Sequence, residues 1–502
     1  MNRICTSLAL FAAVLACFLG GCATVSMEEA FEPVKTGTAG RTGQTPEWRD
    51  VSATGATVDA AISEALEDGL TADEAVAIAL TNNRRLQAVY AEVGIAEAQY
   101  VQAGLLKNPT LSGVLYYAPH DRKIWDFEVV TDFIHILMTP MRKQLAEAER
   151  EQVRLTVQSE VVGVVADVRR AYYQIQADQQ MRELWETVLE ATEAAFEMAL
   201  HLREAGNIPQ IAVMGERALF EDAKLRLAAA EAAVVADREH LNDLMGLWGD
   251  PASWTITERL PDIPEEAFDT AHIERRVLEQ SFDLDAAYRS VETAARRYGI
   301  EQVTAVLPEV EVGMAFERER ETETHLKKKE YLTETEYELE EERGPEVWWV
   351  GPALSLPIPI FDQGQARRAL ARAEIRQQWD RYTALAVELR TAARLAAYRL
   401  RTAREVALSH RDVIVPLRHR ITQQTHLRYN GMFVGVFDLL RAKQAEIAAG
   451  QRYIESIHAY WMARTDVDQL LMGRALSPGQ ISPAGMAAGG PVAGGGGPGD
   501  GH

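Results

Sequence analysis

Two short stretches of the sequence, HLREAG at residues 201–206 and HLRYNG at residues 426–431, are nearly the same. They share four of six residues and begin 225 positions apart (426 minus 201). Four identities carry weight only if the sequence around both copies also corresponds. It does, and this correspondence predicts the fold.

The sequence before the first copy predicts a helix, two strands and a long helix. The first helix begins at Thr71, with Glu74 at capping-box spacing, and ends at Lys107 before an Asn-Pro pair. Aromatic and β-branched residues predict strands at 110–117 and 124–138. Residues 141–204 contain no Pro and one Gly, so a helix of 64 residues and ~96 Å is expected.

The residues after HLREA predict a turn and a returning helix. Gly206 and Asn207 suit a left-handed helix end, and Pro209 suits the start of the next helix. That helix is expected to run to about Met245 and to be followed by a loop at 251–264.

The second copy repeats this order. A helix is expected at 271–306, strands at 309–316 and 347–361, and a second long helix up to Arg428 that Pro416 should kink. Asn430 and Gly431 break this helix, and a helix returns over 434–471. The sequence therefore predicts an internal repeat, with copies at 70–264 and 265–475.

Two segments fall outside the predicted repeat. Residues 317–346, between the strands of the second copy, carry 18 charged side chains in 30 residues. A solvent-exposed hairpin and a disordered charged loop both fit this segment. The Gly/Pro/Ala-rich tail at 476–502 is expected to be disordered.

The N-terminus is typical of a bacterial lipoprotein signal. Arg3 precedes a short apolar stretch and Leu19-Gly20-Gly21-Cys22. Residues 1–21 would be removed and Cys22 would carry covalent lipid, which gives firm anchoring when several acyl chains are attached. An ordinary secretory signal, or cleavage at Cys17, is the alternative.

The mature chain is expected to hold no disulfide, because Cys5 and Cys17 would be removed with the leader and Cys22, the third and last cysteine, would carry the lipid. Residues 22–69 mix Gly, Thr, Pro and acidic residues without a period and are expected to form an extended arm.

Composition and motifs argue against several classes of protein. The chain has 74 acidic and 52 basic residues, which argues against nucleic-acid binding. It contains no HExxH, Walker A or GxSxG pattern, so we expect neither an enzyme nor a cofactor other than the lipid on Cys22. We also expect no metal site.

Four strands and two long hairpins need neighbouring subunits. Strands of 8 to 15 residues can cross an outer membrane, but the smallest single-chain barrels have about eight strands. Open strand edges are not tolerated in hydrocarbon, so spanning strands would have to be shared between copies. Long helices with small and moderate apolar residues also need lateral partners.

Several motifs together resemble the TolC-type outer-membrane efflux protein family, over roughly residues 65–475. The matching segments are LTADEAVAIALTNN at 70–83, AGLLKNP at 103–109, LPIPIFDQG at 356–364, Gly431 and FDLLRA at 437–442.

This resemblance implies a mainly α fold with a small β part. Long antiparallel hairpins form a periplasmic tunnel, continuous with a transmembrane β-barrel to which each of three subunits gives four strands. It implies a homotrimer in the outer membrane of a Gram-negative cell, a periplasmic adaptor protein and an inner-membrane resistance-nodulation-division pump as partners, and passive export of small molecules.

The resemblance also assigns roles at the hairpin turns. Asp438 matches an acidic residue that lines the closed aperture, and Arg441 stands where some members have a second acid. Arg441 could pair with Asp438 or weaken cation selectivity, and a helix N-terminal charge is the alternative role for Asp438. The expected adaptor-docking residues are Gly206, Asn207, Pro209, Asn430, Gly431, Val434, Gly435 and Val436, although the first turn departs from the usual pattern.

Two other functions remain open. The chain could be the outer component of a type I protein-secretion system, or a non-conducting lipoprotein scaffold made of coiled-coil hairpins. The cargo cannot be named from the sequence.

Overall fold

The computed structural model describes residues 25–49, 69–118, 122–248, 254–256, 258–305, 310–330 and 335–481. They fall into two compact units, which we describe separately. Among these residues, unit 1 contains Ile95–Gln152 and Ala287–Arg381, and unit 2 contains Met27–Gly94, Val153–Ala286 and the chain from Tyr382. Cys22 and most of the C-terminal tail lie outside the described residues.

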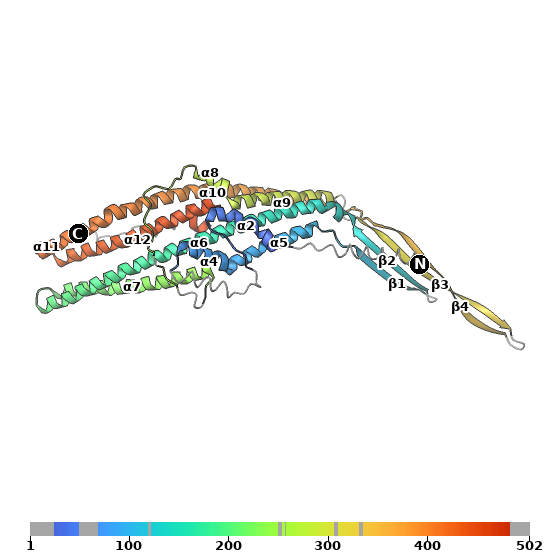
Figure 1. The fold of residues 1–502 in the computed structure, drawn as a ribbon, viewed down its shortest axis with the longest axis horizontal. Helices are drawn as coiled ribbons and strands as arrows, with labels where there is room; N and C mark the ends of the chain where they lie inside the picture. Colours follow the sequence, from blue (N-terminus) through green and yellow to red (C-terminus); the bar gives the residue numbers. More distant parts are fainter. Residues whose placement is uncertain are drawn as a thin grey trace, which may run out of the picture. The chain divides into compact units, whose positions relative to one another are not determined.

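A four-stranded antiparallel sheet is the main β element of unit 1. Its strands are β1 (Thr110–Ala118), β2 (Arg122–Asp132), β3 (Glu311–Glu330) and β4 (Thr335–Ser355), in that spatial order (Figure 1). Strands β3 and β4 remain paired as far as Glu330 and Thr335. The charged insert therefore forms a hairpin rather than a disordered loop.

The second strand ends earlier than the sequence suggested. We expected it to reach Met138, but helix α6 (Phe133–Glu204) begins directly after Asp132. Asp132 Oδ1 accepts a hydrogen bond from the His135 amide at 2.9 Å and so caps the first turn of the helix. This local cap overrides the β-branched and aromatic composition of the segment.

In unit 2 the N-terminal arm is not fully extended, which corrects our expectation for that segment. Met27–Thr42 form helix α2, which buries Ala30, Phe31 and Val34. The arm is helical because those side chains lie on one face and pack against α5 (Arg84–Gly104), where Phe31 and Tyr90 have ring centroids 4.8 Å apart.

The helix expected from Thr71 to Lys107 is two helices. Thr71 and Glu74 form the expected capping box at the start of α4 (Ala72–Asn82). The chain then breaks at Asn83, whose Oδ1 accepts from the amides of Arg85 and Leu86 and caps α5. Ser281 separates α8 (Ile273–Gln280) from α9 (Phe282–Thr304) in the same way, with its Oγ accepting from the Leu284 amide.

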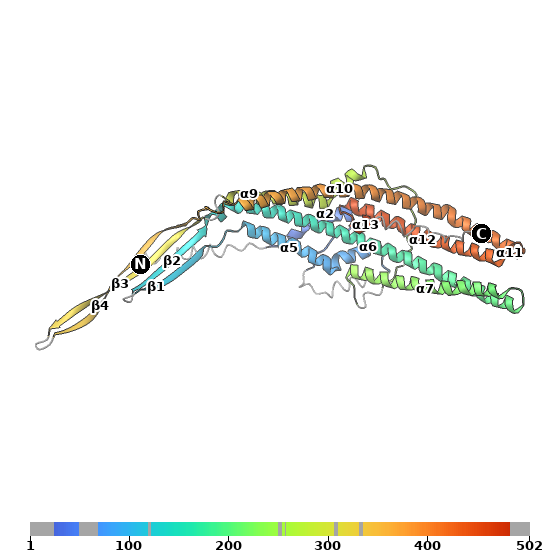
Figure 2. The same cartoon turned by 180° about the vertical axis from the view of Figure 1, so that it is seen from behind.

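Two long hairpins lie side by side in unit 2 (Figure 2) and share apolar contacts there, although the first helix of each begins in unit 1. The first consists of α6 and α7 (Gln210–Met245). The second consists of α10 (Gln365–Ser409), a π-helical turn η2 (His410–Ile414) and α11 (Val415–Asn430), followed by α12 (Val436–Met472). The short helix α13 (Pro478–Ile481) follows.

The π-helical turn lies where Pro416 was expected to kink the helix. Proline has no amide hydrogen, so Pro416 cannot complete the usual bond to the residue four positions earlier. The amide of Val415 instead donates to the carbonyl of His410, five residues back.

Four apolar clusters lie in unit 2, the smallest of which consists of Val162, Phe282 and Met472. The arm cluster joins α2, α4, α5, α6 and α7 and includes Phe31, Tyr90, Tyr172, Ile175 and Leu241. The α10–α12 cluster includes Leu389, Tyr460 and Leu470. The hairpin cluster lies nearer the first turn and consists of Trp185, Val188, Ala223 and Ala230, with Leu184, Leu227 and Ile447 packed against it.

Candidate functional site

The first hairpin turns at Gly206, as the sequence predicted. Gly206 has a φ of 77°, a left-handed conformation that glycine adopts at little cost. Its amide donates to the Arg203 carbonyl, and the Asn207 amide donates to the Leu202 carbonyl at 2.9 Å. These two bonds form a Schellman motif, and Pro209 is the N-cap of α7.

The second hairpin makes the same motif one residue later. Gly431 has a φ of −82°, and Met432 takes the left-handed position with a φ of 67°. The Met432 amide donates to the Tyr429 carbonyl and the Phe433 amide to the Arg428 carbonyl, both at 2.9 Å. The sequence analysis missed Met432, because a methionine rarely occupies this conformation.

The two turns lie at the same end of unit 2, beyond the labels α7 and α11 in Figure 1. Near this end, Leu440 of α12 approaches Gly215 of α7, where a Cβ built on the glycine would lie 3.6 Å from Leu440 Cδ1. Glu216 is next to this contact. Burial raises the pKa of its carboxyl, and the charge of Lys443 opposes that rise.

Asp438 lies in the first turn of α12, on the protein surface. Its Oδ2 accepts a hydrogen bond from the Gly435 amide at 3.3 Å. Within the described part of the chain, no ion pair joins Asp438 to Arg441, and both side chains are exposed. In a single chain, Asp438 therefore supports the helix start, and a role at an aperture would require other copies.

The second turn presents apolar side chains to solvent. Met432 is 93% exposed and Phe433 is 83% exposed, and Phe437 follows on the first turn of α12. Val434 and Val436 are partly buried between them. The expected docking residues Gly206, Asn207, Pro209, Asn430, Gly431, Val434, Gly435 and Val436 thus lie at or beside the two turns, with Met432 and Phe433 as neighbours that the prediction did not include.

The sheet of unit 1 has two chemically different faces. Residues opposite one another in antiparallel strands lie on the same face, and the face alternates along each strand. The register therefore places the following side chains on one face: Leu111, Leu115, Trp125, Phe127, Val129, Met314, Phe316, Trp348, Val350 and Pro352, with Gly113 among them and Arg318 near its end. Trp125 and Phe127 stack there, with ring centroids 6.0 Å apart.

The opposite face of the sheet is mixed and carries six carboxylates among the described side chains, namely Asp126, Glu128, Asp132, Glu311, Glu317 and Glu319. It holds Ser112, Val114, Tyr116, Ile124, Asp126, Glu128, Ala315, Glu317, Glu319, Val347, Trp349 and Gly351. Asp126 and Glu317 are direct cross-strand partners. The alternation of residue types along β1 to β4 indicates in the sequence that the sheet has two faces. Residues of different strands could be assigned to the same face only once the register was known.

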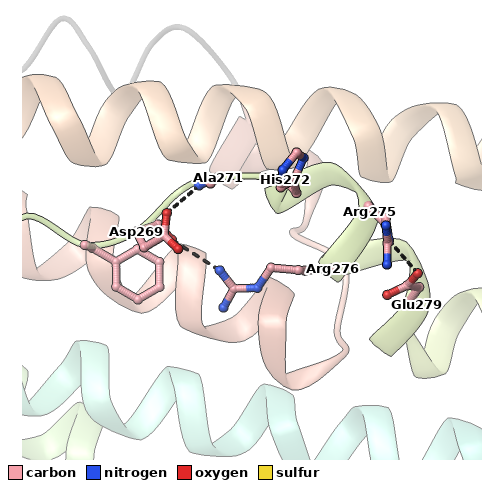
Figure 3. Close-up of a pocket in the computed structure, with 7 residues that line it drawn as sticks. Asp269, Ala271, His272, Arg275, Arg276 and Glu279 are labelled. Atoms are coloured by element: carbon pink, nitrogen blue, oxygen red, sulfur yellow. Dashed lines mark hydrogen bonds and ion pairs between the residues drawn. The ribbon is translucent and has the colours of Figure 1, made fainter.

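A depression near α8 is lined by Phe268, Asp269, Ala271, His272, Arg275, Arg276 and Glu279. Figure 3 shows that its charged side chains have partners beside them: Arg275 Nε lies 2.9 Å from Glu279 Oε1, and Arg276 donates to the Asp269 backbone carbonyl. The Asp269 carboxylate accepts from the Ala271 amide. Within the described ranges, no group of three or more His, Cys, Asp or Glu side chains is placed to hold a metal ion.

None of the helices in the described residues is both long and apolar enough to cross a membrane.

Part of the chain matches a known protein family. Residues 141–247, which contain most of α6, the first turn and α7, match the family of outer membrane efflux proteins. This match agrees with the resemblance predicted from the sequence.

Whole-chain comparisons extend the similarity. The chain is 22% identical over 408 residues to the cobalt-zinc-cadmium resistance protein CzcC of Cupriavidus metallidurans, covering 80% of this chain and 90% of that protein. Its fold is similar to that of the CmeC outer membrane channel of Campylobacter jejuni, with a TM-score of 0.63 and 15% identity over 84% of this chain and 89% of that one.

A second solved structure gives the same result. The MtrE outer membrane channel of Neisseria gonorrhoeae, in its open state, superposes with a TM-score of 0.62 and 18% identity, covering 80% of this chain and 89% of that one. At these identities the likeness concerns the fold, and it confirms the mainly helical architecture with a small antiparallel sheet.

Proposed function

We propose that this chain, which carries an outer membrane efflux protein domain and the fold of solved efflux channels, is the outer-membrane exit duct of a tripartite efflux system. In this proposal three copies form the duct. A periplasmic adaptor and an inner-membrane pump deliver the cargo, and the duct conducts it passively. The chain would have no catalytic role.

The two-faced sheet is the observation that carries this proposal. A β-barrel wall in a membrane alternates apolar residues toward lipid with polar residues toward the lumen. The sheet has this alternation, with an aromatic-rich face and a face that carries Asp126, Glu128 and Glu317. A scaffold that never entered a membrane would have no use for the exposed side chains of Leu111, Trp348 and Val350.

The sheet also favours assembly from several copies. Strands β1 and β4 are its two edges, and each has one side without a partner strand among the described residues. Open edges are costly in hydrocarbon, so each β4 would pair with β1 of the next copy. Three copies would give twelve strands, above the minimum of about eight.

The aromatic residues divide between lipid and lumen in this arrangement. Trp125 and Trp348 lie on the apolar face and would join the girdle at the membrane interface. Trp349 lies on the opposite face and would point into the barrel. Of the three tryptophans in the sheet, two would therefore contact lipid.

Cationic cargo fits the lumen better than anionic cargo. Three copies would bring nine carboxylates from Asp126, Glu128 and Glu317 to one wall, which attracts cations and repels anions. The name of the relative CzcC refers to cobalt, zinc and cadmium, which are supplied as cations. We therefore infer that small cations or cationic compounds are among the exported molecules.

The remaining features of the duct follow from the sequence. Cys22 would carry the lipid anchor after removal of residues 1–21, with the arm leading to the folded body. The two segments 70–264 and 265–475 would be repeats of one ancestral unit. Asp438 from three copies would form an acidic ring at the aperture, and the turn residues would contact the adaptor.

Single-particle electron microscopy of the detergent-solubilised, lipid-modified protein tests the assembly. We expect a threefold particle with a lumen enclosed by helices. A monomer, or a bundle without a lumen, would favour the scaffold instead.

Bilayer current measurements test the lumen. We expect cation-selective current, reduced in selectivity by the double change Asp126→Asn and Glu317→Gln. Ser112→Ala, on the same face and without a change in charge, is the matched control. An anion-selective current, or selectivity unaffected by the double change, would contradict an acidic barrel wall.

A further inference from the structure

Four short segments of unit 1 surround the edge of the sheet at which the strands join the helices (Figure 1). We call them the collar, and they are residues 103–109 before β1, 133–143 after β2, 296–305 before β3 and 356–372 after β4. The register brings the four segments to the same edge, because β1 and β3 begin opposite the last residues of β2 and β4. In the proposed duct this edge faces the periplasm.

The collar is basic, although the chain as a whole is acidic. It contains eight Lys and Arg residues and two acids, whereas the chain has a net charge of −22. Both acids, Glu301 and Asp362, lie beside Arg367, at 3.7 and 3.9 Å. With Asp132 and Glu311 of the adjoining strand ends included, cations still outnumber acids by eight to four. The collar therefore keeps an excess of positive charge.

Three of the collar cations are held by groups without a charge. Arg372 donates from Nε to the Tyr298 hydroxyl at 2.9 Å, and Arg368 donates to two backbone carbonyls of its own segment, at 3.2 and 3.3 Å. Lys143 lies over the Tyr100 ring, 5.2 Å from its centroid. These partners fix the side chains without cancelling their charge, and Lys143 and Arg372 are exposed. An anion can therefore approach them from solvent.

The collar also exposes large apolar side chains. Phe361 is 92% exposed and Ile358 is 76% exposed, and Leu106 is exposed in the segment before β1. Phe361 and Ile358 follow the apolar face of the sheet along β4, where Leu354 pairs with Val312. Apolar side chains reach the acyl chains of a lipid layer, while long Lys and Arg side chains place their charges at the headgroups. The collar thus has the composition of a surface at the boundary between lipid and water.

The depth of the collar fits this boundary. In the proposed duct Trp348 belongs to the aromatic girdle, and Leu356 lies eight residues further along the chain (356 minus 348). Eight residues of extended strand span ~26 Å, and a tilt of ~40° reduces this to ~20 Å. The apolar band of an outer-membrane barrel is ~25 Å tall, so its other limit falls between Leu356 and Phe361.

We propose that the collar binds the anionic headgroups of phospholipids in the periplasmic leaflet of the outer membrane. Its place at that leaflet rests on the proposed function, whereas its preference for anions rests on its own composition. A second copy of the chain is a poorer occupant, because it would bring the same excess of positive charge to the contact. Bound anionic lipid would hold the junction of sheet and helices at a fixed depth.

Lipid competition on the full-length, lipid-modified protein in detergent tests the collar. The protein is mixed with equal amounts of phosphatidylglycerol, which is anionic, and phosphatidylcholine, which has no net charge. Native mass spectrometry then counts the lipids that the protein retains. We expect phosphatidylglycerol to be enriched about fivefold or more, because one basic side chain near an anionic surface contributes about that factor. Raising the salt concentration should reduce the enrichment.

Two variants locate the binding surface. The double change Lys143→Gln and Arg372→Gln should lower the enrichment several-fold. The double change Arg217→Gln and Lys224→Gln removes the same charge from exposed positions on α7 and should keep it. If the collar variant does not fold, Arg368→Gln makes the same test by removing one charge per copy.

Equal retention of the two lipids by the unaltered protein would overturn the proposal, and so would equal enrichment in the collar variant and the α7 variant. A trimer that retains no lipid would also overturn it, because another copy then covers the collar. The same spectra report how many copies assemble. A monomer that prefers phosphatidylglycerol would contradict the trimeric duct and support the collar, whereas a trimer without this preference would contradict the collar alone.

Discussion

The two hairpins of unit 2 are similar in order but differ in how they are stabilised. The first encloses the hairpin cluster, in which Trp185 is only 7% exposed. Helix α11 of the second hairpin has no buried residue, although α12 beside it buries several. The last part of the outgoing arm of the second hairpin, helix α11, therefore lacks a core of its own in a single chain, whereas α10 before it is buried in the α10–α12 cluster.

The difference shows which helix needs a neighbour. Val413 of η2 and Leu417 and Ile421 of α11 are exposed and spaced four residues apart, which places them along one face. A helix with an exposed apolar stripe is stable when another surface covers it. In the proposed trimer, that surface would be another copy of this chain.

Removing the core of the first hairpin should have the largest effect. Trp185→Ala leaves a cavity between α6 and α7, at a cost of about 3–5 kcal/mol. We expect exchange protection to fall throughout residues 181–230, measured by hydrogen-exchange mass spectrometry. Leu225→Ala, at an exposed position on α7, is the control. An equal loss in both variants would show that the hairpin cluster does not stabilise this hairpin.

A charge placed among the exposed apolar residues Val413, Leu417 and Ile421 should weaken trimer formation and leave the folding of the single chain unchanged. Leu417→Asp would place an unpaired carboxylate against the neighbouring copy, which costs ~1–3 kcal/mol or more at each contact. We expect light scattering to report fewer trimers, with unchanged helix content. Gln423→Asp puts the same charge on a different side of α11. Trimers that tolerate Leu417→Asp would mean that this stripe is not covered.

The stability of the two turns should differ in its sensitivity to replacing the glycine with alanine. Gly206→Ala forces a Cβ into a left-handed position and should destabilise the first turn by about 1–2 kcal/mol. Gly431→Ala meets no backbone strain, but its Cβ would lie 2.8 Å from the Phe433 ring, which is exposed and can move aside, and 3.6 Å from the Arg428 carbonyl oxygen, so we expect a smaller loss. Local exchange at each turn measures both. A larger loss of exchange protection in Gly431→Ala than in Gly206→Ala would contradict the assignment of the left-handed conformation to Met432 rather than to Gly431.

Met432→Gly, by contrast, should stabilise the second turn. Glycine relieves the positive φ of Met432, and part of the benefit is lost to its greater freedom when unfolded. We expect slower exchange at the second turn, by a factor corresponding to ~1 kcal/mol or less. Faster exchange would show that contacts of the methionine side chain outweigh its backbone strain.

The smallest expected effect separates two roles of Asp438. Asp438→Asn keeps an oxygen that can accept from the Gly435 amide but removes the negative charge near the helix N-terminus, at a cost of about 0.3–1 kcal/mol. An acidic aperture predicts a clear loss of cation selectivity in bilayer currents with little change at the turn. Unchanged selectivity would leave Asp438 as a helix-capping residue.

The sequence predicted the elements with strong periodicity or composition. It placed both long hairpins, the Thr71 capping box and the first turn at Gly206, because these depend on residues close together in the chain. It missed the helix start at Phe133, the breaks at Asn83 and Ser281, and helix α2, because each depends on a single cap or on packing against distant residues.

The candidate sites divide in the same way. The positions of the two turns could be predicted, because glycine, asparagine and proline break helices. The left-handed conformation of Met432 could not, because it depends on the residue at which α11 ends. The assignment of each strand residue to a face required the register between strands that are nearly 200 positions apart.

The open sheet has a consequence for how the protein is made. In the part of the chain that the structure describes, β1 and β4 are strand edges without a partner, and one face of the sheet carries aromatic and aliphatic side chains that water disfavours. Such a chain is an aggregation hazard until the edges are covered. In the proposed trimer, pairing of these edges with those of other copies would compete with aggregation, so the concentration of subunits would limit how many chains reach the assembled state.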